Sequence, residues 1–306
     1  MNAMSSKTFF LTLFLFPSVL FGQLDTIHYM PPFFASEAQG EQFIFLSTPS
    51  QQDITVEVRT PQGILIRNVV INNANPDFIY FGDDETTRLM VEEDQLGIPQ
   101  DDEGLIFRSD QEFYCNYRVT SNDGNHSGSI TCKGTIARGR IFRPGHMITS
   151  NAFGFKSNTV SIIALENATV RFSNLPDGLD LANVGITNGT ETFQLNAGET
   201  ITLSAIYFIF APNDVRGFFG SLIESTGDLV VNVGSHTGGI LANNFRDIGV
   251  DQIVPMKSLG TEYILVRGNG LDEMENIMVC FHENNTELSI NGGFEGTFNA
   301  GDFFQI

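Results

Sequence analysis

The sequence predicts an all-β protein with antiparallel strands. Short runs in which apolar and polar residues alternate, rich in Val, Ile, Thr, Phe and Tyr, are separated by clusters of Gly, Asn, Asp and Pro about every ten residues. Clear examples are residues 54–58, 192–195 and 199–203. No segment has a convincing amphipathic helix pattern, and residues 88–96 suit a short helical turn at most. The chain is 42% hydrophobic and contains 28 Phe, which is typical of a folded chain and excludes disorder.

Residues 1–22 have the pattern of a secretory signal peptide. Lys7 is the only charge before Asp25, residues 9–16 are apolar, and Gly22 offers a small residue for cleavage. The apolar run is too short to cross a membrane, and no later segment approaches 18 apolar residues. We therefore expect cleavage near Gly22, a secreted or cell-surface protein, and no membrane insertion.

The charge of the chain excludes two classes of partner. The formal net charge is −20, and such a surface repels the phosphates of nucleic acids and anionic membranes. We expect no nucleic acid among the partners, and a chain that is monomeric or part of a longer polypeptide.

One strand pattern recurs along the chain. Residues 160–172 contain two apolar strand patterns joined by a polar turn at Glu166-Asn167, which predicts a β-hairpin. The pattern returns at residues 277–290, with Glu283-Asn284 at its turn, and Thr169 matches Thr286 at an offset of 117. A looser form covers residues 43–49 and 53–58. Both Asn-x-Thr turns fit glycosylation sequons. Hydrogen bonding by the Asn side chain within the turn also explains them, and the repeat favours this second interpretation.

Further matches predict a repeating unit. Residues 104–117 match residues 220–233 without a gap at an offset of 116, and Asn196-Ala-Gly-Glu matches Asn299-Ala-Gly-Asp. We therefore divide the chain into unit 1 (23–119), unit 2 (120–240) and an incomplete unit 3 (241–306). Because unit 3 lacks a counterpart of the strand pair at 220–233, we expect this chain to be the N-terminal part of a longer protein.

Two architectures fit such a repeat. Short Gly-rich meanders repeated along a chain favour propeller-like blades, with two blades in each unit. About seven strands in a unit of about 100 residues fit tandem β-sandwich units instead. The propeller is the first expectation and the sandwich is the alternative.

Two cysteines flank a strong turn signal. Asp123-Gly124 is typical of a two-residue hairpin loop, and with this loop Cys115 lies directly opposite Cys132 in a non-hydrogen-bonded pair. We predict a cross-strand disulfide between them, with two buried free thiols as the alternative, since a longer loop shifts the register. Cys280 lies in an apolar strand pattern and is expected to be buried and inert.

Three acidic clusters in unit 1 are candidate calcium ligands, because Ca²⁺ prefers oxygen ligands. Their spacing fits no calcium loop that is known, and solvated acidic loops explain them as well. The candidate residues are Asp83, Asp84, Glu92, Glu93, Asp101 and Asp102. No other cofactor is expected.

Several of these motifs resemble a known family. Residues 114–119, 128–134, 139–145, 259–263 and 283–286 are similar to those of bacterial secreted proteins with the N-terminal domain of IgGFc-binding protein. The resemblance extends over nearly all of residues 23–306. It implies an extracellular, non-catalytic binding or adhesion region, and in bacteria such regions often precede a C-terminal sorting domain of the gliding-motility type.

The first functional expectation is therefore a binding or adhesion module that recognises an extracellular protein or glycan. No serine–histidine–acid, metallohydrolase or phosphate-loop motif occurs in the sequence, so we expect no enzyme. The alternatives are a secreted hydrolase on a β scaffold, which requires acidic or His residues converging in one cleft, and a structural spacer without a ligand.

Overall fold

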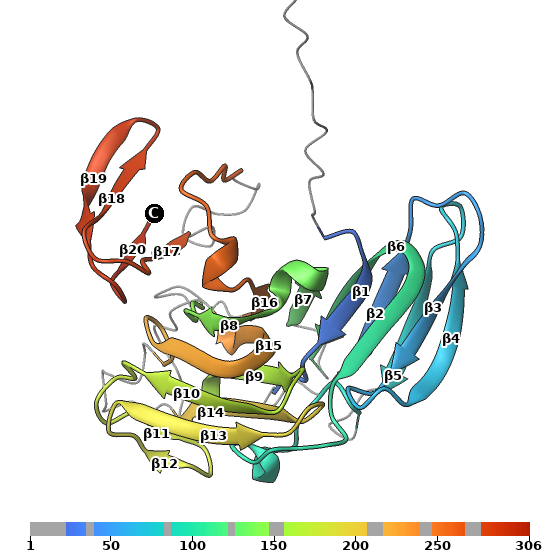
Figure 1. Cartoon of the computed structure of the whole chain (residues 1–306), viewed down its shortest axis with the longest axis horizontal. Coiled ribbons are helices and arrows are strands. Elements are labelled where there is room, and N and C mark those ends of the chain that lie inside the picture. The colour runs from blue at the N-terminus through green and yellow to red at the C-terminus, as the bar shows by residue number, and fades with distance from the viewer. Residues whose placement is uncertain are drawn as a thin grey trace, which may run out of the picture.

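The computed structural model describes residues 23–34, 40–82, 87–121, 126–146, 156–206, 217–238, 247–266 and 277–306 (Figure 1). The signal-peptide prediction for residues 1–22 lies outside them. The described residues form antiparallel strands and three short 3-10 turns, η1 (Glu93–Gln95), η2 (Gly134–Ala137) and η4 (Met256–Ser258). The all-β prediction is confirmed. No helix in these ranges is long and apolar enough to cross a membrane.

The first sheet has seven strands built around the long strand β6. Its first half pairs with β1 on one edge and β3 on the other, and its second half pairs with β7 and β2. Strand β4 extends the sheet beyond β3, and β5 extends it beyond β2. The strands are β1 (Asp25–Met30), β2 (Gln42–Ser47), β3 (Ile54–Arg59), β4 (Leu65–Ile71), β5 (Asp77–Gly82), β6 (Leu105–Thr120) and β7 (Ser127–Thr131).

The second sheet repeats this topology with nine strands around the long strand β15. The first half of β15 pairs with β8 and β10, and its second half pairs with β16 and β9. Strands β13 and β14 extend it beyond β10 and β9, and β11 and β12 are an addition beyond β14. The strands are β8 (Gly139–Phe142), β9 (Lys156–Ala164), β10 (Ala168–Ser173), β11 (Asp180–Leu181), β12 (Gly185–Ile186), β13 (Thr190–Leu195), β14 (Thr200–Ile206), β15 (Leu222–Gly238) and β16 (Asp247–Ile253).

The gapless match between residues 104–117 and 220–233 thus corresponds to the central strands of two equivalent sheets. The predicted unit boundaries at 119 and 240 each separate a strand from its pairing partner. Strand β7 lies beyond the predicted boundary at 119 and β16 beyond the one at 240, yet each pairs with the long strand that precedes it.

The predicted hairpin at residues 160–172 is wrong in its pairing. Both strands form, as β9 and β10, but they lie end to end along the same edge of β15, Ala164 opposite Leu229 and Val170 opposite Ser225. Gly227 lets the connecting turn approach β15 closely, because a Cβ there would lie 3.0 Å from the Asn167 carbonyl oxygen. Local alternation reveals strands but not their partners, which here come from more than 50 residues away.

The described residues of unit 3 repeat the outer part of this pattern. Strand β17 (Met278–Cys280) pairs with β20 (Phe303–Gln305) as β9 does with β14, and β18 (Thr286–Ile290) pairs with β19 (Gly293–Phe298) as β10 does with β13. The register corrects one match: Thr286 occupies the place of Ala168, not of Thr169. Asn285, in a left-handed conformation (φ 59°), is the extra residue.

The recurrent turn motifs lie against each other in both units. The Asn167 side-chain oxygen accepts a hydrogen bond from the Ala197 amide (2.8 Å), and Asn284 accepts one from Ala300 (3.1 Å). The glycine of each Asn-Ala-Gly turn has positive φ, 87° at Gly198 and 89° at Gly301. Turn chemistry therefore accounts for these motifs.

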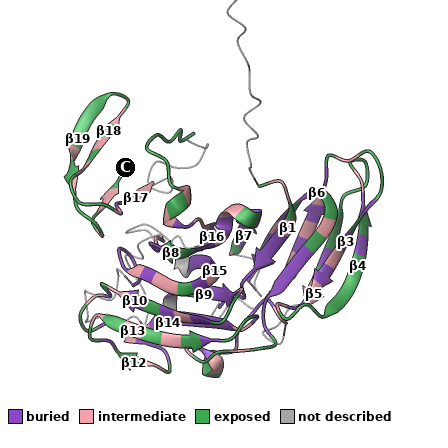
Figure 2. Cartoon of the chain, viewed as in Figure 1, coloured by how far each residue is buried: buried purple, intermediate pink, exposed green. Residues whose placement is uncertain are grey.

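Each long strand carries core residues from both of its halves. The core of the first sheet includes Phe107 before the bend of β6 and Tyr117 after it, so the sheet curls around one core (Figure 2). The second sheet has its own core, with Phe172 and Val231 among its members. Among the described residues the strands form these two wide curled sheets and two separate strand pairs, β17 with β20 and β18 with β19. The propeller and the tandem sandwich both remain unconfirmed architectures.

Candidate binding cleft

The two long strands bend at equivalent residues. In β6 the Ser109 hydroxyl accepts a hydrogen bond from the Gln111 amide (3.4 Å), and in β15 the Ser225 hydroxyl accepts one from the Gly227 amide (3.3 Å). The two serines occupy the same place in the matching segments 104–117 and 220–233, and such hydroxyl–amide bonds compete with ladder pairing. The serine therefore marks the place where each strand leaves one half of its sheet and enters the other.

A cleft of about 540 Å³ lies beside the bend of β6. This volume falls within the usual range for small-ligand sites. Its walls come from β1, β3 and β6, and from one residue between η2 and β8. The lining residues are Thr26, Ile27, Tyr29, Thr55, Glu57, Arg108, Ser109, Asp110 and Arg138.

Arg108 is the exposed cation of this cleft. It lies opposite Glu57 in the register of β6 and β3, but the Glu57 carboxylate accepts a hydrogen bond from Arg59 (2.8 Å) instead. This bond is the main reason why the pKa of Glu57 is lowered. Within the described ranges Arg108 has neither a hydrogen bond nor an ion pair, so its guanidinium is free to bind an anionic or carbonyl group.

Tyr29 and Arg138 also line the cleft. Tyr29 is buried, which raises the pKa of its hydroxyl, while the neighbouring Arg138 opposes that shift. Arg138 also reaches Asp228 at 3.4 Å. It therefore belongs both to the cleft and to a polar network on the second sheet.

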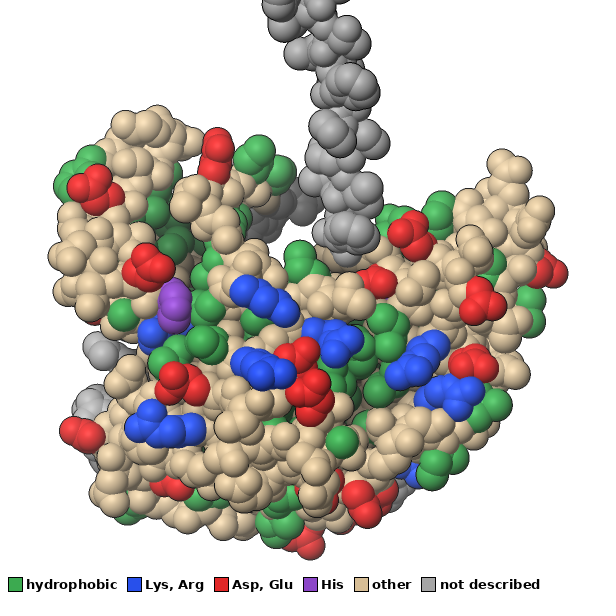
Figure 3. All heavy atoms as spheres, viewed as in Figure 1, with side chains coloured by type: hydrophobic (Ala, Val, Ile, Leu, Met, Phe, Trp, Pro, Cys, Tyr) green, Lys and Arg blue, Asp and Glu red, His purple; other side chains and the backbone are tan. Residues whose placement is uncertain are grey.

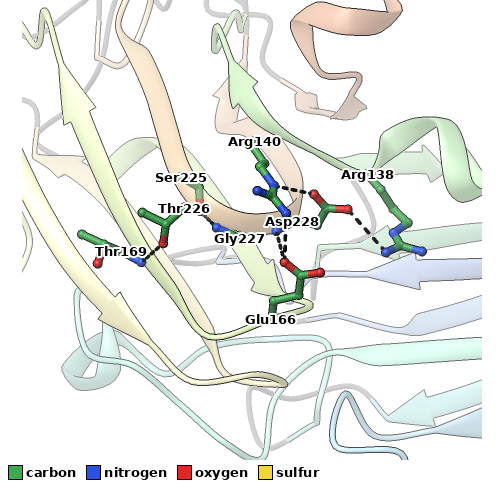
Figure 4. A network of polar contacts seen from close by, with 8 residues as sticks. All are labelled: Arg138, Arg140, Glu166, Thr169, Ser225, Thr226, Gly227 and Asp228. Carbon is green, nitrogen blue, oxygen red and sulfur yellow. Dashed lines mark hydrogen bonds and ion pairs between the residues drawn. The ribbon is translucent and has the colours of Figure 1, made fainter.

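That network closes the bend of β15 (Figure 4). The Asp228 carboxylate accepts a hydrogen bond from Arg140 (2.9 Å), which lowers its pKa, and Arg140 also pairs with Glu166 at 3.2 Å. The Glu166 carboxylate accepts a further hydrogen bond from the Asp228 amide (3.3 Å). The charged groups at this bend are thus neutralised by one another.

Basic side chains form a band on one face of the molecule. Figure 3 shows Lys and Arg side chains across the middle of this face, with acidic side chains between and around them. The cleft itself is lined by two arginines, Arg108 and Arg138, and two carboxylates, Glu57 and Asp110, so the net charge of −20 alone does not predict what it attracts.

Four of the six acidic candidates for calcium binding lie in the part of the chain that the structure describes. Asp83 and Asp84 lie outside the described residues. The remaining candidates, Glu92, Glu93, Asp101 and Asp102, belong to a part of the chain in which no group of three or more His, Cys, Asp or Glu side chains is arranged to hold a metal ion.

Glu103 follows the candidates Asp101 and Asp102, and the sequence did not single it out. It is buried, one of its oxygens has no partner in the described part of the chain, and burial together with Asp102 raises its pKa to about 8. Charge counting marks acidic clusters but not which member is buried, so no signal in the sequence distinguished Glu103.

The predicted register of the two cysteines is confirmed, but the prediction that they form a non-hydrogen-bonded pair is wrong. Cys115 lies opposite Cys132, but the Cys132 amide donates to the Cys115 carbonyl (2.9 Å), so this pair is hydrogen-bonded. The reason is that Ser121 and His126 form the nearest hydrogen-bonded pair to the loop, which shifts the alternation by one.

Both cysteines are buried thiols, with their sulfurs 3.6 Å apart. Opposite residues in hydrogen-bonded pairs have Cα atoms about 5.5 Å apart, a separation that disulfides commonly bridge. The disulfide between Cys115 and Cys132 therefore stays a prediction. Cys280 is only partly buried, although burial raises its pKa to about 11.

A family model described as IgGFc binding protein matches residues 136–306. The match begins in η2 and covers more than half of the chain, including the second sheet and unit 3. No curated protein and no solved structure matches the chain. The chain therefore belongs to the IgGFc-binding protein family.

Proposed function

We propose that this protein acts outside the cell as a non-catalytic binding module, and that a protein or glycan ligand docks in the cleft beside the bend of β6. The observation that carries the proposal is the unpaired Arg108 among the hydroxyls of Thr26, Thr55 and Ser109. Hydroxyls and a free guanidinium suit the hydroxyl, carbonyl and carboxylate groups of glycans and peptide segments. Membership of a binding family supports the same function.

The lowered pKa of Glu57 favours binding over hydrolysis. A glycosidase needs one carboxyl with a raised pKa that can donate a proton. Glu57 is held in the opposite direction, because Arg59 donates a hydrogen bond to its charged form. A general acid in this position would require Arg59 to move away.

The test is to screen the secreted protein against a glycan array and against extracellular proteins immobilised on a surface, with Arg108→Glu as the cleft variant. We expect affinity to fall ten-fold or more. The substitution replaces the free guanidinium with a carboxylate, which repels the carbonyl and carboxylate oxygens of the ligand. The matched control is Arg171→Glu, on β10 away from the cleft, which should leave affinity unchanged. Binding that Arg108→Glu leaves intact contradicts the cleft as the binding site.

A further inference from the structure

Strands β5, β2, β6 and β7 lie side by side and form an outer face of the first sheet. Side chains alternate between the two faces of a strand, so in β2 Ile44 and Leu46 are buried while Phe43 and Phe45 lie on the outer side and are only partly buried. The name aromatic face denotes the outer residues of these four strands. They are Phe78 and Tyr80 of β5, Phe43, Phe45 and Ser47 of β2, Tyr114, Asn116 and Arg118 of β6, and Ser127, Ser129 and Thr131 of β7.

Four aromatic rings cover one side of the aromatic face. In the register of β2 and β5, Phe43 lies opposite Tyr80 and Phe45 lies opposite Phe78. Neighbouring ring centroids are between 5.3 and 6.0 Å apart, which is the usual separation of aromatic pairs in contact. Phe78 and Tyr80 are nevertheless 52% and 49% exposed. The rings therefore form a continuous apolar surface that solvent reaches, and such surfaces mark binding sites.

The other side of the aromatic face carries hydrogen-bonding groups. Asn116 lies opposite Phe45 of β2 and opposite Thr131 of β7. Its side-chain amide donates hydrogen bonds to the hydroxyls of Ser129 (3.0 Å) and Thr131 (3.1 Å). The Nε of Arg118 donates to the Asn116 side-chain oxygen (3.2 Å), and the guanidinium carbon lies 4.7 Å from the centroid of the Phe45 ring. Aromatic rings and polar groups are thus adjoining strips of one surface.

Charge limits what suits the aromatic face. Arg118 is its one charged residue, and in the part of the chain that the structure describes only the Nε of its guanidinium has a hydrogen-bond partner. An acidic partner, including a second copy of this chain, meets the repulsion of the net charge of −20. A basic partner meets Arg118 itself. A neutral occupant avoids both kinds of repulsion.

We propose that the aromatic face binds a neutral polysaccharide. A pyranose ring has apolar faces of C–H groups and a rim of hydroxyls. The C–H faces stack on the exposed rings of Phe78 and Tyr80, which removes apolar area from water. The rim hydroxyls exchange hydrogen bonds with the Arg118 guanidinium and with the Asn116 side chain.

The shape of the aromatic face favours a sugar chain over a folded protein. Protein interfaces depend on side chains of one partner that fill pockets of the other. Here the rings pack against one another across adjacent strands, so they form a platform rather than separate anchors. Four neighbouring strands make this platform roughly 14 Å wide, which is wider than a single sugar ring.

The aromatic face shares no residue with the cleft. Both surfaces use β6, but Arg108 and Ser109 line the cleft from its first half, whereas Asn116 and Arg118 belong to its second half, beyond the bend. The proposal is therefore independent of the function proposed for the cleft, and each surface can be disabled without the other.

The test is affinity electrophoresis of the whole protein through native gels that contain a soluble polysaccharide. The neutral probes are a xylan, a mannan, a galactan and a glucan, and polygalacturonate is the acidic control. We expect at least one neutral probe to retard the protein, equally at low and high salt, because no ion pair holds the ligand. Polygalacturonate should leave the mobility of the protein unchanged.

Variants assign the binding to the aromatic face. Phe78→Ala removes a half-exposed ring and should lower the affinity for the retarding probe at least ten-fold, whereas Phe78→Tyr keeps the ring and should bind as the unmodified protein does. Arg118→Ala leaves the core intact and should also weaken binding. The matched control is Val70→Ala, which removes an exposed apolar side chain of β4 outside the aromatic face and should have no effect. Arg108→Glu should be retarded normally, so the two proposed surfaces fail separately.

Three results would overturn the proposal. The first is that no neutral probe retards the protein; if an immobilised extracellular protein then binds the unmodified chain but not Phe78→Ala, the occupant is a protein. The second is retardation that Phe78→Ala and Arg118→Ala leave unchanged. The third is a dimer in sedimentation that Phe78→Ala dissociates, because a second copy would then cover the aromatic face.

Discussion

The bends of β6 and β15 occupy equivalent positions in two sheets of the same topology, yet one is open and the other closed. At β15, Arg140 and Glu166 surround Asp228, and the polar groups satisfy one another. At β6 the equivalent stretch, residues 109–112, borders the cleft, and Arg108 is left without a partner in the described part of the chain. A cross-strand charge pair is even reversed: Glu57 opposes Arg108 in the first sheet, and Arg171 opposes Glu224 in the second.

This difference indicates that the curl of the sheet and the charges on its surface depend on different residues. The serine at each bend and the apolar halves of each long strand preserve the curl, whereas the charged residues beside the bend are free to vary. The described residues of unit 3 extend the series, since they form the outer strand pairs, β17 with β20 and β18 with β19. Each of the following changes probes one of these contrasts.

The largest contrast is expected between the cores of units 2 and 3. Phe172→Ala removes a fully buried ring of β10 and should lower the free energy of unfolding of the second sheet by about 3–5 kcal/mol. Ile290→Ala, at the counterpart position in β18, should cost below about 1 kcal/mol, because its side chain is only partly buried. Urea unfolding followed by hydrogen exchange assigns each loss to its unit. Equal losses would mean that unit 3 has a complete core.

The second contrast concerns the cysteines. Where the first sheet has Cys115 opposite Cys132, the second has Val231 opposite Ile253. If the predicted disulfide forms in the secreted protein, reducing it should lower the free energy of unfolding of the first sheet by about 3 kcal/mol, given the short loop that it closes. Thermal unfolding with and without reductant measures this.

The control for the cysteines copies the second sheet. The double variant Cys115→Val, Cys132→Ile should fold and be insensitive to reductant. Peptide mapping without reduction that finds both residues as free thiols in the secreted protein would contradict the disulfide.

The third contrast is between the ion network at the bend of β15 and the open bend of β6. Asp228→Asn should destabilise the second sheet by about 1–2 kcal/mol at neutral pH, since two arginines lose a charged partner and the site is partly exposed. Arg140 lowers the pKa of Asp228 in the folded protein, so this stabilisation is complete above the unfolded pKa of about 3.9 and is lost as pH falls through the lower folded value.

The lowered pKa of Asp228 predicts how the effect of Asp228→Asn on the free energy of unfolding changes between pH 7 and pH 2.5. The difference between the protein and Asp228→Asn should be constant above about pH 5 and shrink below about pH 4. A difference that grows in acid would mean that another carboxyl dominates this bend.

Sequence alone predicted the strands and the repeat well, because both depend on local alternation and on turn residues such as Gly198 and Asn167. It failed on which strands pair. Residues 160–172 contain two good strands and a tight turn, but the partner of both is β15, and a buried central strand gives no local sign of its neighbours.

The candidate site was almost invisible in the sequence. Its residues come from β1, β3, β6 and the link between η2 and β8, and none stands in a motif that carries chemistry. Arg108 is unpaired in the described part of the chain because the Glu57 carboxylate accepts its hydrogen bond from Arg59 instead. Side-chain geometry decides this choice of partner, and the sequence does not show it. The acidic clusters, by contrast, were conspicuous in the sequence, and their described members are not arranged for a metal.

The smallest contrast is at the turn between β9 and β10. Asn167→Ala removes the acceptor of the Ala197 amide and should cost about 0.5–1.5 kcal/mol, whereas Asn284→Ala, with a longer bond of 3.1 Å in an open unit, should cost less. Asn167→Asp keeps an oxygen acceptor but destroys the glycosylation sequon, so it separates the two roles of this residue. Stability retained by Asn167→Asp and lost by Asn167→Ala supports turn chemistry, as measured by urea unfolding. If both variants lose stability equally, the Asn167 side-chain oxygen is not what holds the Asn-Ala-Gly turn against the turn between β9 and β10.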